Sequence, residues 1–206
     1  MIYDRLLSAA IEHFGRHGFE GASTRAIAAA SGTAMSSITY HFGGKEGLYL
    51  AVAEHIAEQI AARQGPVLEI IRSGAITTPE QARQGLLAMV EAFARMMIAP
   101  ESGAWSSFIV REQQEPTAAF ERLYDGAIST LVETFMTLIV IARPDLEERQ
   151  AYMTGIFLYG QALVLRVGFA SVCRVLEIES IDAETERQLL ARLRATTLSV
   201  LSEKPE

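Results

Sequence analysis

Residues 18–48 of the chain read GFEGASTRAIAAASGTAMSSITYHFGGKEGL, and this stretch determines the architecture of the N-terminal part. Thr24 is a preferred N-cap residue, so we predict a short helix over residues 25–31. Gly32 then interrupts the chain, and a second short helix is predicted over residues 35–42. The pair Gly43-Gly44 ends that helix, because glycine accepts the left-handed conformation that follows a helix. Two short helices joined by a tight glycine turn are typical of a helix-turn-helix motif.

Helical periodicity extends on both sides of this motif. Apolar side chains recur at helical spacing over residues 2–17, which predicts an amphipathic helix that Gly18 ends. Lys45 opens a long helix that is predicted to pass Ala62. The helix-turn-helix is therefore braced by one helix before it and one after it. We assign residues 1–47 to a helix-turn-helix domain and residues 48–206 to a second helical domain.

The rest of the chain also reads as helical. Gly65, Pro66, Gly74 and Pro79 predict a loop or broken helix over residues 64–78. Thr78 and Gln81 form a capping box with proline at the first helical position, which predicts a helix from there to residue 98. Further helices are predicted over residues 102–114, 117–141, 145–172 and 183–201, the last one capped by Asp182. The fold class is all-α, with about nine helices and no strand.

Composition limits the function without deciding it. Half of the residues are hydrophobic, which is ample for a packed core, and the net charge is −7. The first 48 residues carry four basic and four acidic side chains, so the whole excess lies beyond them. This N-terminal segment, called the head below, is neutral overall but can still bind DNA if its few cations lie at phosphates. Cys173 is the single cysteine, and no signal peptide or membrane span is expected, so a cytoplasmic protein is predicted.

The run Gly18 to Ala28, then Ser31-Gly32, then Ile38 to Leu48, resembles the DNA-binding head of TetR/AcrR-type transcriptional regulators. The resemblance covers roughly residues 4–50, and it implies a helical body that binds a small-molecule effector and forms a homodimer. The segments Phe108 to Gln113 and Pro116 to Phe120 are similar to the body of the CecR-like subgroup. That subgroup is associated with control of membrane transport and antibiotic sensitivity, which is the pathway that the resemblance implies.

A helix of about seven residues fits the major groove, where each base pair has its own donor and acceptor pattern. Ile38 and Phe42 must face the other helices, which leaves the opposite side of the 35–42 helix for DNA. Side chains near the ends of the two short helices, and Lys45 at the start of the next helix, should contact DNA phosphates. The predicted DNA-binding residues are Thr24, Arg25, Thr33, Met35, Ser36, Ser37, Thr39, Tyr40, His41 and Lys45. Because that helix has no Arg or Lys, we expect modest base readout supplemented by DNA shape and two half-sites.

A dimer is required by this mechanism, because one short helix offers few contacts and two reach half-sites one helical turn apart. Apolar stripes on the 145–172 and 183–201 helices suit a four-helix interface, although each stripe also buries its own core. A ligand pocket is predicted among apolar residues with a few polar anchors. Its candidates are Phe93, Met96, Met97, Trp105, Phe108, Phe120, Tyr124, Met136, Phe157 and Gln161, with Arg111 and Arg166 as polar groups. The alternative for each arginine is an ion pair with an acidic neighbour such as Glu112 or Glu115.

Other function classes find little support. No nucleophile with a base and no glycine-rich phosphate loop is evident, so neither an enzyme nor a cofactor is expected. His13 and His17 are i, i+4 neighbours but lack a third ligand, so no metal site is predicted. The sequence predicts a repressor that a small molecule releases from a palindromic operator. The alternative is a helical protein that binds a small molecule but not DNA.

Overall fold

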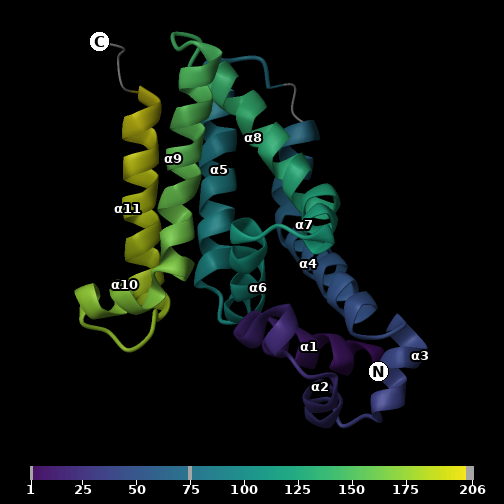
Figure 1. Cartoon of the computed structure of the whole chain (residues 1–206). Helices are drawn as coiled ribbons and strands as arrows, with labels where there is room; N and C mark the ends of the chain where they lie inside the picture. The colour runs from purple at the N-terminus through teal and green to yellow at the C-terminus, as the bar shows by residue number, and fades with distance from the viewer. Residues whose placement is uncertain (1, 74–75, 203–206) are drawn as a thin grey trace. The chain divides into compact units, whose positions relative to one another are not determined.

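The computed structural model describes residues 2–73 and 76–202, and all regular elements in this part of the chain are helices (Figure 1). The all-α prediction is confirmed. The elements are α1 (Ile2–Gly21), α2 (Thr24–Ala30), α3 (Met35–Phe42), α4 (Lys45–Ser73), α5 (Pro79–Ile98), α6 (Ser102–Gln114), α7 (Ala118–Leu123), the π-helix η1 (Tyr124–Ile128), α8 (Ser129–Ala142), α9 (Glu148–Val167), α10 (Phe169–Leu176) and α11 (Ala183–Ser202).

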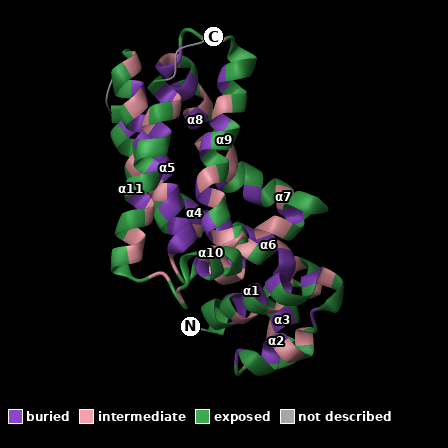
Figure 2. Ribbon diagram, turned by 90° about the vertical axis from the view of Figure 1, so that its left-hand side faces the viewer, coloured by how far each residue is buried: buried purple, intermediate pink, exposed green. Residues whose placement is uncertain are grey.

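The chain forms two compact units. Unit 1 comprises residues 1–61 and 101–129, and unit 2 comprises residues 62–100 and 130–206. In unit 1, α1 packs against α6 and α2, and α2 packs against α3. Its core includes Phe14, Ile27, Ile38, Leu48 and Phe108, each at most 2% exposed. Burial follows the inward side of each helix (Figure 2). The helix-turn-helix thus rests on an apolar core of its own unit.

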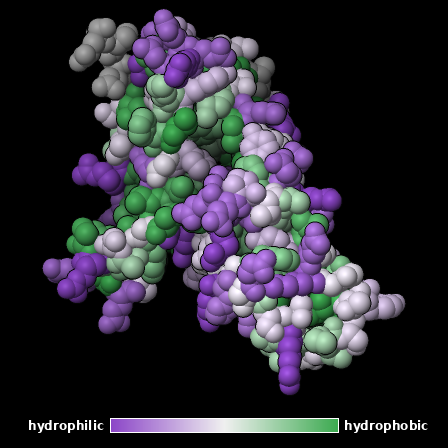
Figure 3. All heavy atoms as spheres, in the orientation of Figure 1, coloured by the Kyte–Doolittle hydropathy of each residue, from purple (hydrophilic) through white to green (hydrophobic). Residues whose placement is uncertain are grey.

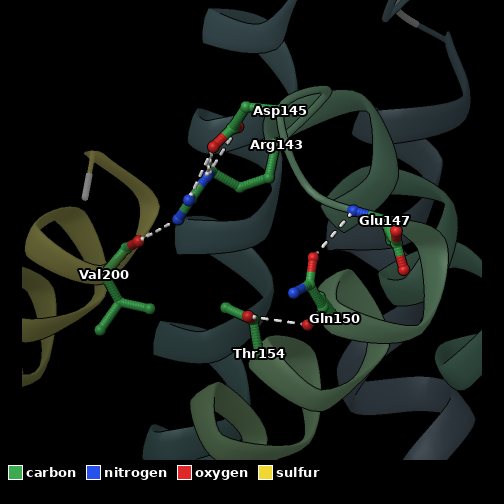
Figure 4. Close-up of polar contacts among 6 residues, drawn as sticks. All are labelled: Arg143, Asp145, Glu147, Gln150, Thr154 and Val200. Carbon is green, nitrogen blue, oxygen red and sulfur yellow. Dashed lines mark hydrogen bonds and ion pairs between the residues drawn. The ribbon is translucent and has the colours of Figure 1, made fainter. Parts of the chain in front are cut away.

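Unit 2 is built around α5, which packs against α9 and α11. α10 follows α9 after a break at Gly168 and contacts it. The junction between α8 and α9 is fixed by polar contacts (Figure 4). Arg143 is buried and donates to the Asp145 carboxylate and to the Val200 carbonyl oxygen, 2.8 Å from Nη1. Gln150 accepts from the Glu147 backbone N–H at 3.1 Å, which begins α9 with a capping box.

Several predicted helix ends are confirmed, each by a short-range signal. Thr78 accepts from the Gln81 backbone N–H, and Gln81 accepts from the Thr78 N–H, so the predicted capping box opens α5. Asp182 accepts from the Thr185 N–H at 2.8 Å at the start of α11. Gly43 ends α3 in the left-handed conformation, with φ 75°. Gly18 breaks α1 with φ 70°, although helical turns resume to Gly21.

Four predicted boundaries are wrong. The N-cap of α2 is Ser23, and Thr24 is already its first helical residue. α4 continues through Pro66 to Ser73, where a loop or broken helix had been expected; the predicted breaker Gly74 lies outside the described residues. The single predicted helix over 117–141 contains the π-helical turn η1. The predicted 145–172 helix begins at Glu148 and stops at Val167, because the backbone changes direction at Gly168.

Exposed apolar side chains are concentrated on α8, α9 and α10. On α9, Ile156 is 59% exposed, Phe157 78% and Val167 58%. Hydrophobic surface covers the α9 and α10 region in the space-filling view (Figure 3). By length and composition alone, the stretch Ala118–Ala142 could cross a membrane, and 28% of its most apolar window is buried. α9 and α10 together also pass this test, but they are bent by 80°.

Candidate nucleic-acid interface

α3 has one face in the core and one face in solvent. Ile38 is 2% exposed, and the ring of Phe42 stacks on Tyr3 with centroids 5.0 Å apart. On the other side, Tyr40 is 85% exposed and Met35 is 58% exposed. Ser36, Thr39 and His41 are exposed as well, and Ser37 is half-buried. The helix therefore presents hydroxyls, an imidazole and a thioether outward, as the sequence predicted for a helix that reads a groove.

The turn between α2 and α3 is held by short hydrogen bonds. The Ser31 hydroxyl lies 2.9 Å from the Ala28 carbonyl oxygen, to which it donates, and 2.8 Å from the Thr33 hydroxyl. The Thr33 N–H also donates to the Ala28 carbonyl at 2.9 Å. Gly32 has φ 64°, which favours glycine there. Because the turn is rigid, α3 is held in a fixed orientation relative to α2.

Lys45 stands at the first turn of α4, directly after the α3–α4 turn. Its Nζ donates to the Glu20 carbonyl oxygen at 3.3 Å and lies 4.7 Å from the centroid of the Phe19 ring. These contacts hold the half-buried ammonium next to the N-terminus of α4, where the helix dipole also attracts anions. A Cβ on Gly47 would lie 1.8 Å from the Phe42 carbonyl oxygen. The close approach of α4 to α3 therefore requires glycine at position 47.

The first turn of α2 adds two more predicted contact residues. Arg25 is exposed and Thr24 is half-buried. Sequence reasoning missed a further cation in the neighbourhood: Nη1 of Arg5, on α1, lies 3.8 Å from the position that a Cβ on Gly32 would occupy. The signal was available, since Arg5 is one of only four basic residues in the first 48, but its closeness to the turn depends on how α1 crosses α2. Arg5 thus joins the exposed cations beside the helix-turn-helix.

The predicted ligand residues fall in both units, and each group is described by itself. In unit 1, Trp105 and Phe108 are buried, Phe120 stacks with the exposed Tyr124, and Arg111 is exposed beside Gly18. In unit 2, Met96 and Met97 are buried, and Met136 is half-buried. Phe93 is buried and stacks on Tyr159 at 4.2 Å, whereas Phe157 is 78% exposed.

Two polar members of that set have partners within unit 2. Gln161 donates from Nε2 to the Thr197 hydroxyl at 2.8 Å. Arg166 donates to the carbonyl oxygens of Met97, Ile98 and Ala99 at 2.6, 3.0 and 2.7 Å. These carbonyls belong to the last turn of α5 and the residue after it, which a helix leaves without partners. Arg166 therefore caps α5, and desolvation by burial lowers the pKa of its guanidinium.

Unit 1 also contains a buried polar link that sequence reasoning missed. The Tyr49 hydroxyl donates to Oε1 of Glu112 at 2.6 Å, and Oε2 of Glu112 accepts from the Thr117 N–H and hydroxyl. Glu112 is 1% exposed, and burial, with Glu112 beside it, raises the pKa of Tyr49. The link ties α4, α6 and the first turn of α7 together. It borders an open cleft of about 600 Å³ whose lining includes His17, Phe19, Glu46 and Arg111.

Comparison with known proteins identifies the family. Residues 6–52 match the family described as "Bacterial regulatory proteins, tetR family". Residues 82–203, more than half of the chain, match "HTH-type transcriptional dual regulator CecR, C-terminal domain". The chain belongs to the TetR family, with a CecR-type C-terminal domain. It is thus a DNA-binding transcriptional regulator of a non-enzymatic family, which confirms the resemblance and the expectation that it is not an enzyme.

Individual TetR-family relatives support this assignment. The transcriptional dual regulator CecR of Shigella flexneri is 34% identical over 169 residues, which are 80% of this chain and 75% of that protein. RaaS of Mycobacterium tuberculosis is 46% identical over 65 residues, covering 32% of this chain and 30% of its own.

Two solved structures share the fold of this chain. FadR of Bacillus subtilis in complex with stearoyl-CoA has a TM-score of 0.64 at 14% identity, covering 98% of this chain and 100% of that one. AibR in complex with isovaleryl coenzyme A and operator DNA has a TM-score of 0.68 at 15% identity, covering 95% and 97%. At these identities the likeness concerns the fold alone.

Proposed function

We propose that the protein is a homodimeric repressor that binds a palindromic operator through α3 and leaves it when a small molecule binds. The observation that carries this proposal is the solvent-facing side of α3, where Tyr40 is 85% exposed while Ile38 on the opposite side is 2% exposed. A monomeric head with no partner for this face would gain nothing from an exposed tyrosine on a short helix. A groove of DNA supplies partners for every polar group on that face.

The proposed contacts divide into two kinds. Met35, Ser36, Ser37, Thr39 and His41 face the base edges, and Thr24, Arg25, Thr33, Tyr40 and Lys45 hold the backbone. All of these groups would donate to a charged phosphate, and such bonds exceed those between neutral groups; Arg25 and Lys45 add their own positive charge. Arg5 adds a phosphate contact from α1 beside the α2–α3 turn.

Homodimerisation is supported by the apolar surface of α8 and α9. Val132, Val140, Met153, Ile156, Phe157 and Val164 are all at least 36% exposed in the single chain. Burying such a face against a symmetry-related copy removes it from water and builds a four-helix interface. On α11, the second helix that the sequence suggested, Leu190, Leu193 and Leu201 are already buried within their own chain, so we assign the interface to α8 and α9.

The effector is proposed to bind within the domain that follows the head, residues 48–206. FadR and AibR are regulators of this fold seen with acyl-coenzyme A molecules, which makes stearoyl-CoA and isovaleryl-CoA the first compounds to test. Release requires an effector that binds more tightly to the conformation that cannot engage DNA than to the conformation that can. To raise the population of the released conformation from about 1% to 99%, the two affinities must differ roughly 10⁴-fold. The site of action is the cytoplasm, where the operator is.

A mobility-shift titration with the chain's own upstream DNA tests the proposal. We expect Tyr40→Phe to weaken binding at least about tenfold, because each of the two protomers loses one hydrogen bond to a phosphate. Lys45→Ala should lower the salt slope by about two, one phosphate contact for each protomer. Arg192→Ala, an exposed cation on α11, is the matched control and should bind like the wild type.

Unchanged binding by both head variants, or no binding by the wild type to any upstream fragment, would overturn the operator proposal. A reporter placed behind the bound site separates repression from activation, because only a repressor lowers transcription when it occupies the site.

A further inference from the structure

The first turn of α1 contacts the last turn of α3 through aromatic rings. The ring of Tyr3 stacks on that of Phe42, with the centroids 5.0 Å apart and the planes 26° from parallel. Aromatic pairs at this separation attract each other beyond the area they bury. Phe42 is the last residue of α3, and the ends of helices fray. Tyr3 therefore holds the end of α3 from outside the helix-turn-helix.

The imidazole of His41 lies between two tyrosine rings. Its centroid is 6.3 Å from that of Tyr3 and 5.0 Å from that of Tyr40, and the interplanar angles are 81° and 83°. Edge-to-face contacts are a preferred arrangement of aromatic pairs. Tyr40 belongs to α3 itself, whereas Tyr3 comes from α1. The contact with Tyr3 thus ties the direction of the imidazole to a second helix of the head.

The direction of this imidazole matters for reading a base pair. His41 is exposed, and a neutral imidazole offers one nitrogen as a donor and the other as an acceptor. Each base pair presents its own pattern of donors and acceptors in the major groove. An imidazole that rotates freely can match several of these patterns, and it loses conformational freedom when it binds. An imidazole held in one orientation matches fewer patterns and loses less.

We infer that Tyr3 is a positioning residue for operator recognition: its ring fixes the orientation of the His41 imidazole, which reads one base pair in each half-site. The inference rests on the proposed function, since it assumes that α3 lies in the major groove with His41 facing the base edges. The aromatic ring of Tyr3 performs this role, and its hydroxyl does not, because the contacts with His41 and Phe42 are contacts between rings.

The first test uses the full-length protein without DNA. The chain has four histidines, so the ring-proton resonances of His41 can be assigned by NMR from their loss in His41→Ala. Neighbouring aromatic rings displace such resonances from their position in a free imidazole. Tyr3→Leu should move the His41 resonances toward that free position, and Tyr3→Phe should leave them in place. Unchanged His41 resonances in Tyr3→Leu would overturn the inference.

The second test measures base preference by mobility shift, on copies of the bound upstream fragment in which each base pair is changed singly. The wild type should prefer one base by about tenfold at the position where His41→Ala has no preference. Tyr3→Leu should reduce that preference to about threefold or less and keep the preferences at other positions. Tyr3→Phe should keep all of them. When His41 is already alanine, adding Tyr3→Leu should alter no preference.

Ile2→Ala is the matched control, because Ile2 lies on the same turn of α1 and is 46% exposed, against 43% for Tyr3. It should behave like the wild type in both tests. If Tyr3→Leu weakens binding to all fragments equally, Tyr3 only stabilises the head and the inference fails. It also fails if His41→Ala loses no preference at any position. Absence of wild-type binding to every upstream fragment is a failure of the operator proposal itself, so the two failures are told apart.

Discussion

Buried polar residues and exposed α3 residues of this chain serve two different purposes. Glu112 accepts hydrogen bonds from the Tyr49 hydroxyl and from the N–H and hydroxyl of Thr117, so its carboxylate is compensated where it lies. Arg166 and Arg143 are likewise occupied with carbonyl oxygens. These groups hold helices together. Tyr40 and Met35 on α3 instead point away from the core, so they are free to meet partners from outside the chain.

The Tyr49–Glu112 hydrogen bond predicts a pH dependence at alkaline pH. Burial first, and then the Glu112 carboxylate, raise the pKa of Tyr49 above its ordinary value of 10.0. The folded state therefore disfavours the phenolate. The stabilising contribution is complete below the unfolded pKa near 10 and is lost as the pH rises from there toward the folded value.

Urea unfolding at several pH values between about 8 and 11 measures this contribution. Tyr49→Phe should unfold with about 1–3 kcal/mol less free energy at neutral pH, because a hydrogen bond to a buried carboxylate is lost. The difference between wild type and variant should then shrink as the pH rises past 10, where the unfolded tyrosine ionises. A difference that is constant over this range would contradict the role assigned to Tyr49.

Among the elements, helix ends followed from the sequence wherever the signal was local. Thr78 and Gln81 are three residues apart, and Asp182 and Thr185 are too, so the bonds that begin α5 and α11 need nothing from the rest of the chain. The same holds for the glycines after α3. These signals predicted the helix-turn-helix and most of the helix pattern.

The boundaries that the sequence did not reveal depend on distant contacts. Pro66 is a strong breaker by propensity, yet α4 continues because the buried residues on either side, Ile60 to Ile71, are fixed by packing. The π-turn η1 places Gly126 where a Cβ would lie 2.8 Å from that of Ala57, and no local pattern encodes this closeness. For the site, the exposed α3 residues followed from helical periodicity, whereas the place of Arg5 beside the α2–α3 turn depends on how α1 crosses α2.

The capping box of α5 gives a prediction at this level. Thr78→Ala removes the side-chain acceptor for the Gln81 N–H and should lower the free energy of unfolding by about 1 kcal/mol. The expected fall in melting temperature is about 2–4 °C, measured by circular dichroism. Thr77→Ala is the matched control, because Thr77 contacts Gln81 through its backbone N–H, which the substitution keeps. Equal melting temperatures of the two variants would show that the box does not stabilise α5.

For the molecule as a whole, the function depends on two copies acting together. The eight-residue helix α3 offers only its outer side to DNA, and the neutral head contributes few cations, so a single head would bind weakly. Two heads on one dimer occupy two half-sites, and the second binds at a high effective concentration. Affinity for the operator is therefore coupled to the apolar face of α8 and α9.

Phe157→Glu tests this coupling. Phe157 is 78% exposed, so a glutamate is compatible with the single chain but places a charge in the proposed interface. We expect a monomer by analytical ultracentrifugation and at least a hundredfold loss of operator affinity, roughly the contribution of a second site. Ile70→Glu, which puts the same charge at a residue 72% exposed on α4, is the control and should leave the dimer intact. A dimeric Phe157→Glu variant would rule out this face.

The continuity of α4 has one mechanical consequence. Proline has no N–H, so Pro66 leaves the carbonyl of Ala62 without its helical donor, and Gly65 next to it adds backbone freedom. Ala62 is also the residue at which α4 passes from unit 1 into unit 2. Bending α4 elsewhere breaks a backbone hydrogen bond, whereas at Pro66 that hydrogen bond is already absent. We therefore expect α4, 29 residues long, to bend more easily at this point than elsewhere, so that a force applied to one of its ends is absorbed here first.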